Sequence, residues 1–140
     1  MISHMEAFQY RCFEQFDIDV GRYHVLVGAH GSGKSTLLDI PLFLGDMVSR
    51  GVMPALLEAP APHARARAQS LQELIYCQRG ASFAFALEAV LPDHIVRTLV
   101  ERRPDSVRSD QKRWPHRLRY AVRFQIVNKV ELQVTDGFLL

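Results

Sequence analysis

The sequence predicts an α/β fold: a strand pair, then a strand joined to a helix by a glycine-rich loop, then additional antiparallel strands. Three observations support this fold class. Short stretches with alternating apolar residues are typical of half-buried strands, a glycine-rich loop separates an apolar run from a helical pattern, and further alternating stretches follow toward the C-terminus. The 140 residues are enough for a single lobe with its own core, and no internal repeat is visible.

The chain opens with the strand pair and the strand that leads into the loop. Residues 8–13 and 16–20 are rich in aromatic and β-branched residues, which predicts two strands, whereas residues 1–5 contribute no pattern. Gly21-Arg22 makes a turn. The nearly continuous apolar run Tyr23–Val27 then predicts a strand buried on both faces of a sheet.

The helix after the glycine loop begins near Lys34 and continues with an apolar face through Met47. Pro41 lies inside it, lacks an N–H and crowds the carbonyl four residues back, so we expect a kink or a break there. Residues 53–69 are rich in Ala, Pro and Arg, and residues 104–116 are polar without periodicity. Both predict surface loops, the second one mobile.

The remaining elements alternate between short helices and strands. Ser70 and Glu73 form a capping box ahead of a short helix that Gly80 would end. The other expected elements are a strand over Ser82–Leu91, a short helix over Ile95–Arg102, and strands over Leu118–Val127 and Val130–Thr135 joined by a hairpin at Asn128-Lys129.

Composition excludes several classes of protein. Cys12 and Cys77 show neither a disulfide framework nor zinc-ligand spacing, and the six His residues lack the spacings of known metal motifs. No apolar run approaches a membrane span, and the N-terminus lacks the layout of a signal peptide. We therefore expect a cytoplasmic protein in a reducing compartment.

The glycine loop satisfies the pattern GxxxxGK[ST] over Gly28-Ala29-His30-Gly31-Ser32-Gly33-Lys34-Ser35. Its glycines let the backbone close around a phosphate, and the helix that follows adds its N-terminal partial positive charge. Lys34 would reach the β- and γ-phosphates, the Ser35 hydroxyl would ligate Mg²⁺, and Thr36 would contact the α-phosphate. The pattern predicts binding of ATP with Mg²⁺; the alternative is a glycine-rich turn that only caps a helix.

Hydrolysis needs a metal-holding Asp and a residue that positions water, and no apolar strand in the sequence ends in Asp-Glu. The nearest candidate, Asp136, follows an alternating strand and has no Glu after it. We expect a turn residue there rather than a metal ligand.

Residues 8–48 resemble the N-terminal lobe of ABC-like ATPase heads, the group that includes RecF, the structural-maintenance-of-chromosomes proteins and bacterial AAA-type ATPases of DNA repair and defence. That group opens with an FRSF-like element, here Tyr10-Arg11-Cys12-Phe13, and continues with GxNGSGKSTLLDAI, here Gly28–Ile40 with His30 in place of Asn. The resemblance implies nucleotide contacts at His30, Gly31, Ser32 and Gly33, and an approach of Arg11 to the phosphates. The alternative for Arg11 is a plain surface charge on an edge strand.

The signature motif, the catalytic Asp-Glu pair and the switch His of that group have no match here. The resemblance therefore implies that residues 1–140 are one ATP-binding lobe, an N-terminal fragment whose hydrolysis needs a C-terminal lobe or a partner subunit, with a homodimer as one arrangement. A lone lobe would expose apolar surface that its complement covers. Two other functions remain open: a small P-loop kinase and a non-catalytic nucleotide-binding module.

Positive charge is concentrated in residues 97–123, which hold nine of the 17 Lys and Arg but only three of the 15 acidic residues. The segment from Arg102 to Arg123, with Trp114 and Tyr120 within it, could contact nucleic acid phosphates. The alternative, a solvated loop and strand face, is favoured because acidic residues interrupt the run.

Overall fold

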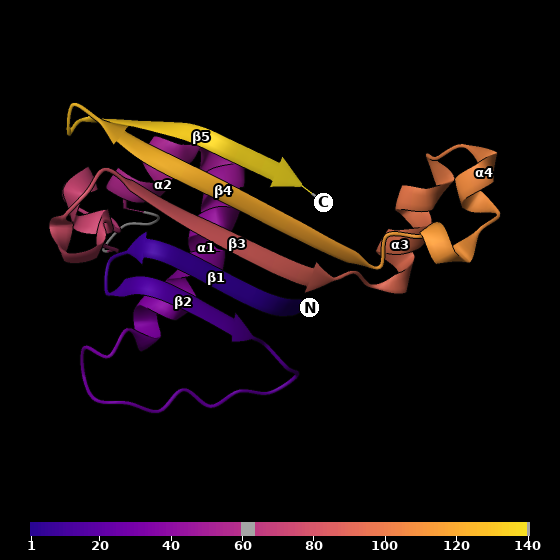
Figure 1. The fold of residues 1–140 in the computed structure, drawn as a ribbon, viewed down its shortest axis with the longest axis horizontal. Helices are drawn as coiled ribbons and strands as arrows, with labels where there is room; N and C mark the ends of the chain where they lie inside the picture. Colours follow the sequence, from indigo (N-terminus) through magenta and orange to yellow (C-terminus); the bar gives the residue numbers. More distant parts are fainter. Residues whose placement is uncertain (60–63, 140) are drawn as a thin grey trace.

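The computed structural model describes residues 1–59 and 64–139 and is built on a five-stranded antiparallel sheet (Figure 1). The strand order is β2-β1-β3-β4-β5. The strands are β1 (Ile2–Tyr10), β2 (Phe13–Asp19), β3 (Ser82–Val90), β4 (Arg117–Val127) and β5 (Glu131–Leu139).

The helices lie on one face of the sheet and beyond one of its ends. Helix α1 (Lys34–Arg50) crosses one face, α2 (Val52–Leu57) follows it, and the opposite face of the sheet has no helix over it (Figure 1). Two 3₁₀ turns, η1 (Leu71–Leu74) and η2 (Tyr76–Gln78), precede β3. Between β3 and β4 the chain forms α3 (Asp93–Glu101), α4 (Asp105–Arg108) and η3 (Gln111–Arg113), which extend beyond the end of the sheet (Figure 1).

An aromatic cluster between α1 and the sheet forms the centre of the core. Phe83 and Phe124 stack at 4.9 Å, and Tyr10 meets Phe85 edge-on at 4.6 Å. Phe43 of α1 reaches the same cluster, 5.7 Å from Phe85. Each such pair adds about 0.5–1.5 kcal/mol beyond area burial, so this cluster fixes α1 on the sheet.

The predicted strand at Tyr23–Val27 is wrong. These residues form no strand, and the side chains of Tyr23 and Val27 are 84% and 88% exposed. A strand buried on both faces needs neighbours along its edges, and none of the strands in the described part of the chain pairs with this segment. After the turn that follows β2, the segment runs back toward α1, apart from the edge of the sheet (Figure 1).

The first strand begins earlier than expected, at Ile2, although residues 1–5 showed no pattern. Met5 and Ala7 face the core, while His4 and Glu6 alternate with them on the other face. Met and Ala are weak strand formers, so the sequence does not indicate a strand here. The two-residue alternation can be recognised only once the strand pairing is known.

The break expected at Pro41 does not occur: α1 continues through this residue as one helix of 17 residues. Ile40 and Phe43, on either side of Pro41, are both fully buried. Their packing offsets the hydrogen bond that proline removes, since tertiary contacts supply most of a helix's stability.

Both predicted surface loops contain helices. Residues 53–69 include most of α2, whose Ala55 and Leu56 are fully buried, while residues 60–63 of that expected loop lie outside the described residues. Residues 104–116 include α4 and η3. Neither segment shows helical periodicity, because α2, α4 and η3 are each shorter than two turns.

The prediction of a capping box at Ser70 and Glu73 is also wrong. The segment forms 3₁₀ turns, Ser70 makes no side-chain cap, and Glu73 instead accepts a hydrogen bond from the Gln69 N–H at 3.0 Å. The later elements agree with their patterns: β3 and β4 match closely, α3 starts two residues earlier than expected, and β5 runs on to Leu139. Asn128 and Lys129 both take positive φ in the hairpin.

Candidate nucleotide-binding loop

The glycine loop leads directly into the first turn of α1. Gly31 and Gly33 have φ angles of 81° and 90°, a region that other residues enter only with strain. Helix α1 begins at Lys34, and the Leu37 N–H donates to the Gly33 carbonyl at 2.9 Å. The loop therefore presents backbone N–H groups and the positive end of the helix dipole on one side.

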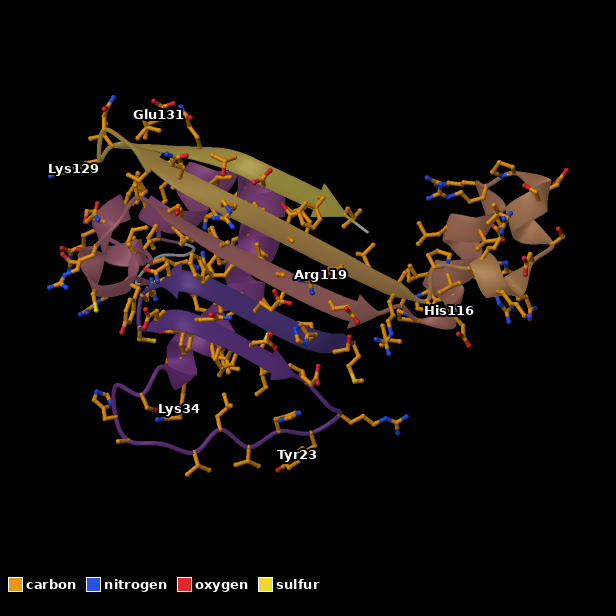
Figure 2. The ribbon with its side chains drawn as sticks, in the orientation of Figure 1. Tyr23, Lys34, His116, Arg119, Lys129 and Glu131 are labelled. Carbon is orange, nitrogen blue, oxygen red and sulfur yellow. The ribbon has the colours of Figure 1, made fainter. Side chains whose placement is uncertain are left out.

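The Lys34 side chain folds back over this loop (Figure 2). Its Nζ donates to the carbonyls of Gly28 at 2.6 Å and Ala29 at 2.8 Å, and to the Ser32 hydroxyl at 3.2 Å. One ammonium group thus draws both ends of the loop together. Phosphate oxygens carry full negative charge, so they attract the ammonium more strongly than these neutral oxygens do.

The other predicted binding residues lie around the same turn. His30 and Ser32 are exposed in the loop, Ser35 is exposed in the first turn of α1, and Thr36 behind it is half-buried. The structure thus places a lysine, two hydroxyl groups and a helix start beside one another, open to solvent.

The β1–β2 turn supports the loop from behind, a contact that sequence reasoning missed. A Cβ atom at Gly33 would lie 2.8 Å from Cys12 Sγ and 3.1 Å from a ring carbon of Phe13. The β1–β2 turn therefore packs tightly against the residue at which the loop enters the helix. The matched FRSF-like element ends in these two residues, which was the only signal in the sequence.

Arg11, in the same turn, is directed toward α1. Its guanidinium donates to the Arg67 carbonyl, lies 3.8 Å from Asp39 Oδ2 and stacks 5.4 Å from the Tyr10 ring centre. Its side chain is only 25% exposed. Arg11 is therefore held in place, unlike the free surface charge considered as the alternative.

A charged network on α1 holds this arrangement, and no pattern in the sequence predicts it. Arg67 bonds Asp39 at 2.8 Å and Asp46 at 2.6 Å, and its guanidinium lies 5.6 Å from the Phe43 ring centre. Burial alone lowers the pKa of Arg67, but the hydrogen bonds that its guanidinium donates to Asp46 and Asp39 more than offset this effect, so the pKa is raised. Burial also raises the pKa of Tyr10, beside Asp39.

Asp136 does not lie in a strand-end turn as expected. It sits within β5 opposite Arg123, and β5 and β2 form opposite edges of the sheet. Because the glycine loop follows β2, the fold separates Asp136 from it.

The basic segment is divided between two parts of the structure. Arg117 and Arg119 lie on the sheet face without helices, where they bond Glu88 at 2.9 Å and Glu6 at 2.8 Å (Figure 2). In the helices between β3 and β4, Arg108 pairs with Asp105 and Arg113 with Asp110. Much of the positive charge is therefore neutralised locally.

The sheet face without helices also carries a hollow of about 320 Å³. Ala84, Ala86 and Ala121 line it together with Phe8 and Phe138, and no residue of the glycine loop takes part. Small side chains on β3 and β4 account for the depression.

Comparison with known proteins gives a likeness in structure but none in sequence. No family model matches the chain, and no curated protein matches its sequence. Among the solved structures that match is one described as "Structural biochemistry of ATP-driven dimerization and DNA stimulated activation of SMC ATPases". It is 16% identical, with a TM-score of 0.55, and the match covers 99% of this chain and 68% of that one. The likeness is in the fold, that of an SMC ATPase domain.

Every helix within residues 1–59 and 64–139 is too short or too polar to cross a lipid bilayer.

Proposed function

We propose that this chain is the nucleotide-binding lobe of an ABC-like P-loop ATPase and that it binds ATP with Mg²⁺. The observation that carries this proposal is Lys34, whose ammonium is aimed into a complete glycine loop at the start of α1. The fold shared with an SMC ATPase domain supports the same class of function.

The residues of the loop fit a triphosphate. Gly31 and Gly33 adopt the conformations that turn successive N–H groups toward an anion, and the Lys34 donors sit among them. Nucleotide phosphates would replace the Gly28 and Ala29 carbonyls as acceptors for Lys34. The exposed Ser35 hydroxyl would ligate Mg²⁺, which would neutralise the phosphate charge.

Turnover would require groups from elsewhere. Asp136 lies at the far edge of the sheet, and the sequence contains no Asp-Glu pair after an apolar strand. A complementary lobe, or a partner subunit that includes a second copy, would supply the metal-holding Asp and the residue that positions water. It would also cover Tyr23–Val27 and the outer face of α1.

Nucleic acid stays a proposed partner. The surface that would contact it is smaller than the whole segment Arg102–Arg123. Arg117 and Arg119 are bound to carboxylates, whereas Arg102, Arg103 and Lys112 make no ion pair within the described residues. Phosphate contacts would therefore fall on the helices between β3 and β4.

Calorimetry with Mg·ATP tests the proposed site, with Lys34→Ala against Lys129→Ala as a matched control. Lys129 lies in the hairpin before β5, well apart from Lys34 (Figure 2). Truncating one partner of a desolvated charge pair costs about 2–5 kcal/mol, so Lys34→Ala should weaken binding at least about 30-fold. Lys129→Ala should bind as the parent chain does.

The same samples, assayed for turnover, separate the three functions. Binding that depends on Lys34 without turnover, together with hydrolysis on adding a complementary lobe, supports the ATPase lobe. Transfer of phosphate to a small acceptor would indicate a kinase, and binding with no turnover under any condition a non-catalytic module. Equal affinities for the Lys34→Ala and Lys129→Ala variants would refute the site itself.

A further inference from the structure

Four side chains of β1 and β2 form a group on the sheet face without helices. His4 lies opposite Asp19, and Glu6 lies opposite Asp17 in the antiparallel register. Since alternate residues of a strand share a face, all four project to the same side. The six histidines had shown no metal-binding spacing in the sequence, but the pairing of the two strands brings these residues together.

The distances within this group are those of potential metal ligands. His4 Nε2 lies 3.0 Å from Glu6 Oε1 and 3.4 Å from Asp17 Oδ1. The three ligand atoms all lie within 4.8 Å of one another. An ion placed among them could reach all three at about 2.0–2.2 Å after small side-chain rotations.

Asp19 orients the imidazole. His4 Nδ1 lies 2.8 Å from Asp19 Oδ1, so a neutral imidazole protonated at Nδ1 would donate to this carboxylate and turn its Nε2 lone pair toward Glu6 and Asp17. Metal-bound histidines almost always donate their second ring N–H in this way. The His4 side chain is 20% exposed, which leaves room for water as a further ligand.

The charge of the group favours a divalent cation. Glu6 and Asp17 are directly opposed carboxylates, an arrangement that is unfavourable without a cation between them. Arg119 supplies one positive charge through its 2.8 Å bond to Glu6 Oε1. Three carboxylates against one guanidinium leave a net charge of −2 around the imidazole.

We propose that His4, Glu6 and Asp17 bind a divalent first-row transition metal such as Zn²⁺, with Asp19 as the positioning residue for His4. One imidazole and two carboxylates are a donor set that suits Zn²⁺, and water would complete the coordination. The site is independent of the glycine loop and links the two strands that precede it.

Titration of the metal-free chain with Zn²⁺ tests this site, in a Cys12→Ser/Cys77→Ser background that removes the exposed thiols. One equivalent should bind. His4→Ala and Asp17→Asn should each abolish that equivalent, and Asp19→Asn should weaken it about 10-fold, the scale of a lost outer-shell contact. His94→Ala, an exposed histidine of α3, is the matched control and should leave binding unchanged.

Thermal unfolding gives a second readout, because an ion that bridges β1 and β2 binds only the folded chain. Zn²⁺ should raise the Tm of the background protein and of His94→Ala but not that of Asp17→Asn, a substitution on an exposed side chain. The proposal is overturned if no equivalent binds with a Kd below about 1 mM, or if His4→Ala and Asp17→Asn bind as the control does.

Discussion

At the scale of single residues, Gly31 and Gly33 show two separate reasons for a glycine in this loop, a positive φ angle and close packing. Both have positive φ, but a side chain at Gly31 would meet no atom within 4 Å, whereas at Gly33 it would meet Cys12 and Phe13. Both positions therefore favour glycine for its backbone conformation, but only Gly33 also lacks space for a side chain.

Gly31→Ala should cost about 1–2 kcal/mol, the strain of an alanine in the left-handed region. Gly33→Ala should cost about 1–3 kcal/mol more, because it also overpacks the contact with the β1–β2 turn. Urea unfolding measures both, and calorimetry with Mg·ATP should show the larger loss of affinity for Gly33→Ala. Equal destabilisation by the two substitutions would mean that the turn does not support the loop.

The residues of the loop could be predicted from the sequence because their pattern is local: glycines, lysine and hydroxyl group stand within eight positions. Arg67 could not be predicted in the same way. Its partner Asp39 lies 28 positions away, and only the path of the chain after α2 brings the two together. An arginine in a stretch rich in Ala, Pro and Arg looks like a surface residue until its partners are known.

At the scale of elements, α1 depends on Arg67 for two of its carboxylates. Arg67→Ala would leave Asp39 and Asp46 without their shared partner, at side-chain exposures of 20% and 29%. Breaking a buried pair costs about 3–5 kcal/mol, and partial exposure reduces this to about 2–3 kcal/mol here. Urea unfolding should show that loss.

Arg65→Ala is the control for this experiment, since Arg65 is exposed in the same segment. It should change the free energy of unfolding by less than about 0.5 kcal/mol. A loss in Arg65→Ala as large as in Arg67→Ala would assign the effect to charge in the segment as a whole rather than to the network on α1.

The alternation of apolar and other residues predicted strands well where one face of the strand packs on the core. Strand β3 alternates Phe83 and Phe85 inward with alanines outward, so its period is visible in the sequence. The run Tyr23–Val27 failed for a different reason. A continuous apolar run indicates that a segment can be buried on both faces, but it holds no information on whether neighbours are present to bury it.

At the scale of the whole molecule, apolar surface is exposed on one side of the lobe. Leu38 and Leu42, one helical turn apart on α1, are 58% and 64% exposed, and Tyr23, Val25 and Val27 in the preceding segment are more than half exposed. Where such exposed apolar side chains gather into a patch, they are typical of contact sites.

The isolated chain should therefore self-associate at micromolar concentration, and Leu42→Glu should shift it toward the monomer. Sedimentation velocity over a concentration series measures this. Val130→Glu, at a 74% exposed site in the hairpin before β5, is the control. A chain that stays monomeric throughout the series would show that this surface is stable in water.

The helices between β3 and β4 are attached to the sheet at a single point. The Leu91 N–H donates to the His116 carbonyl at 2.9 Å, and Val90 is paired with Arg117 just before it. The two ends of residues 92–115 thus meet as the two ends of an ordinary hairpin turn would. Residues 92–115 therefore form an insertion that a tight turn could replace. Another small domain could also be grafted at the same position, and the sheet and the glycine loop would be unchanged.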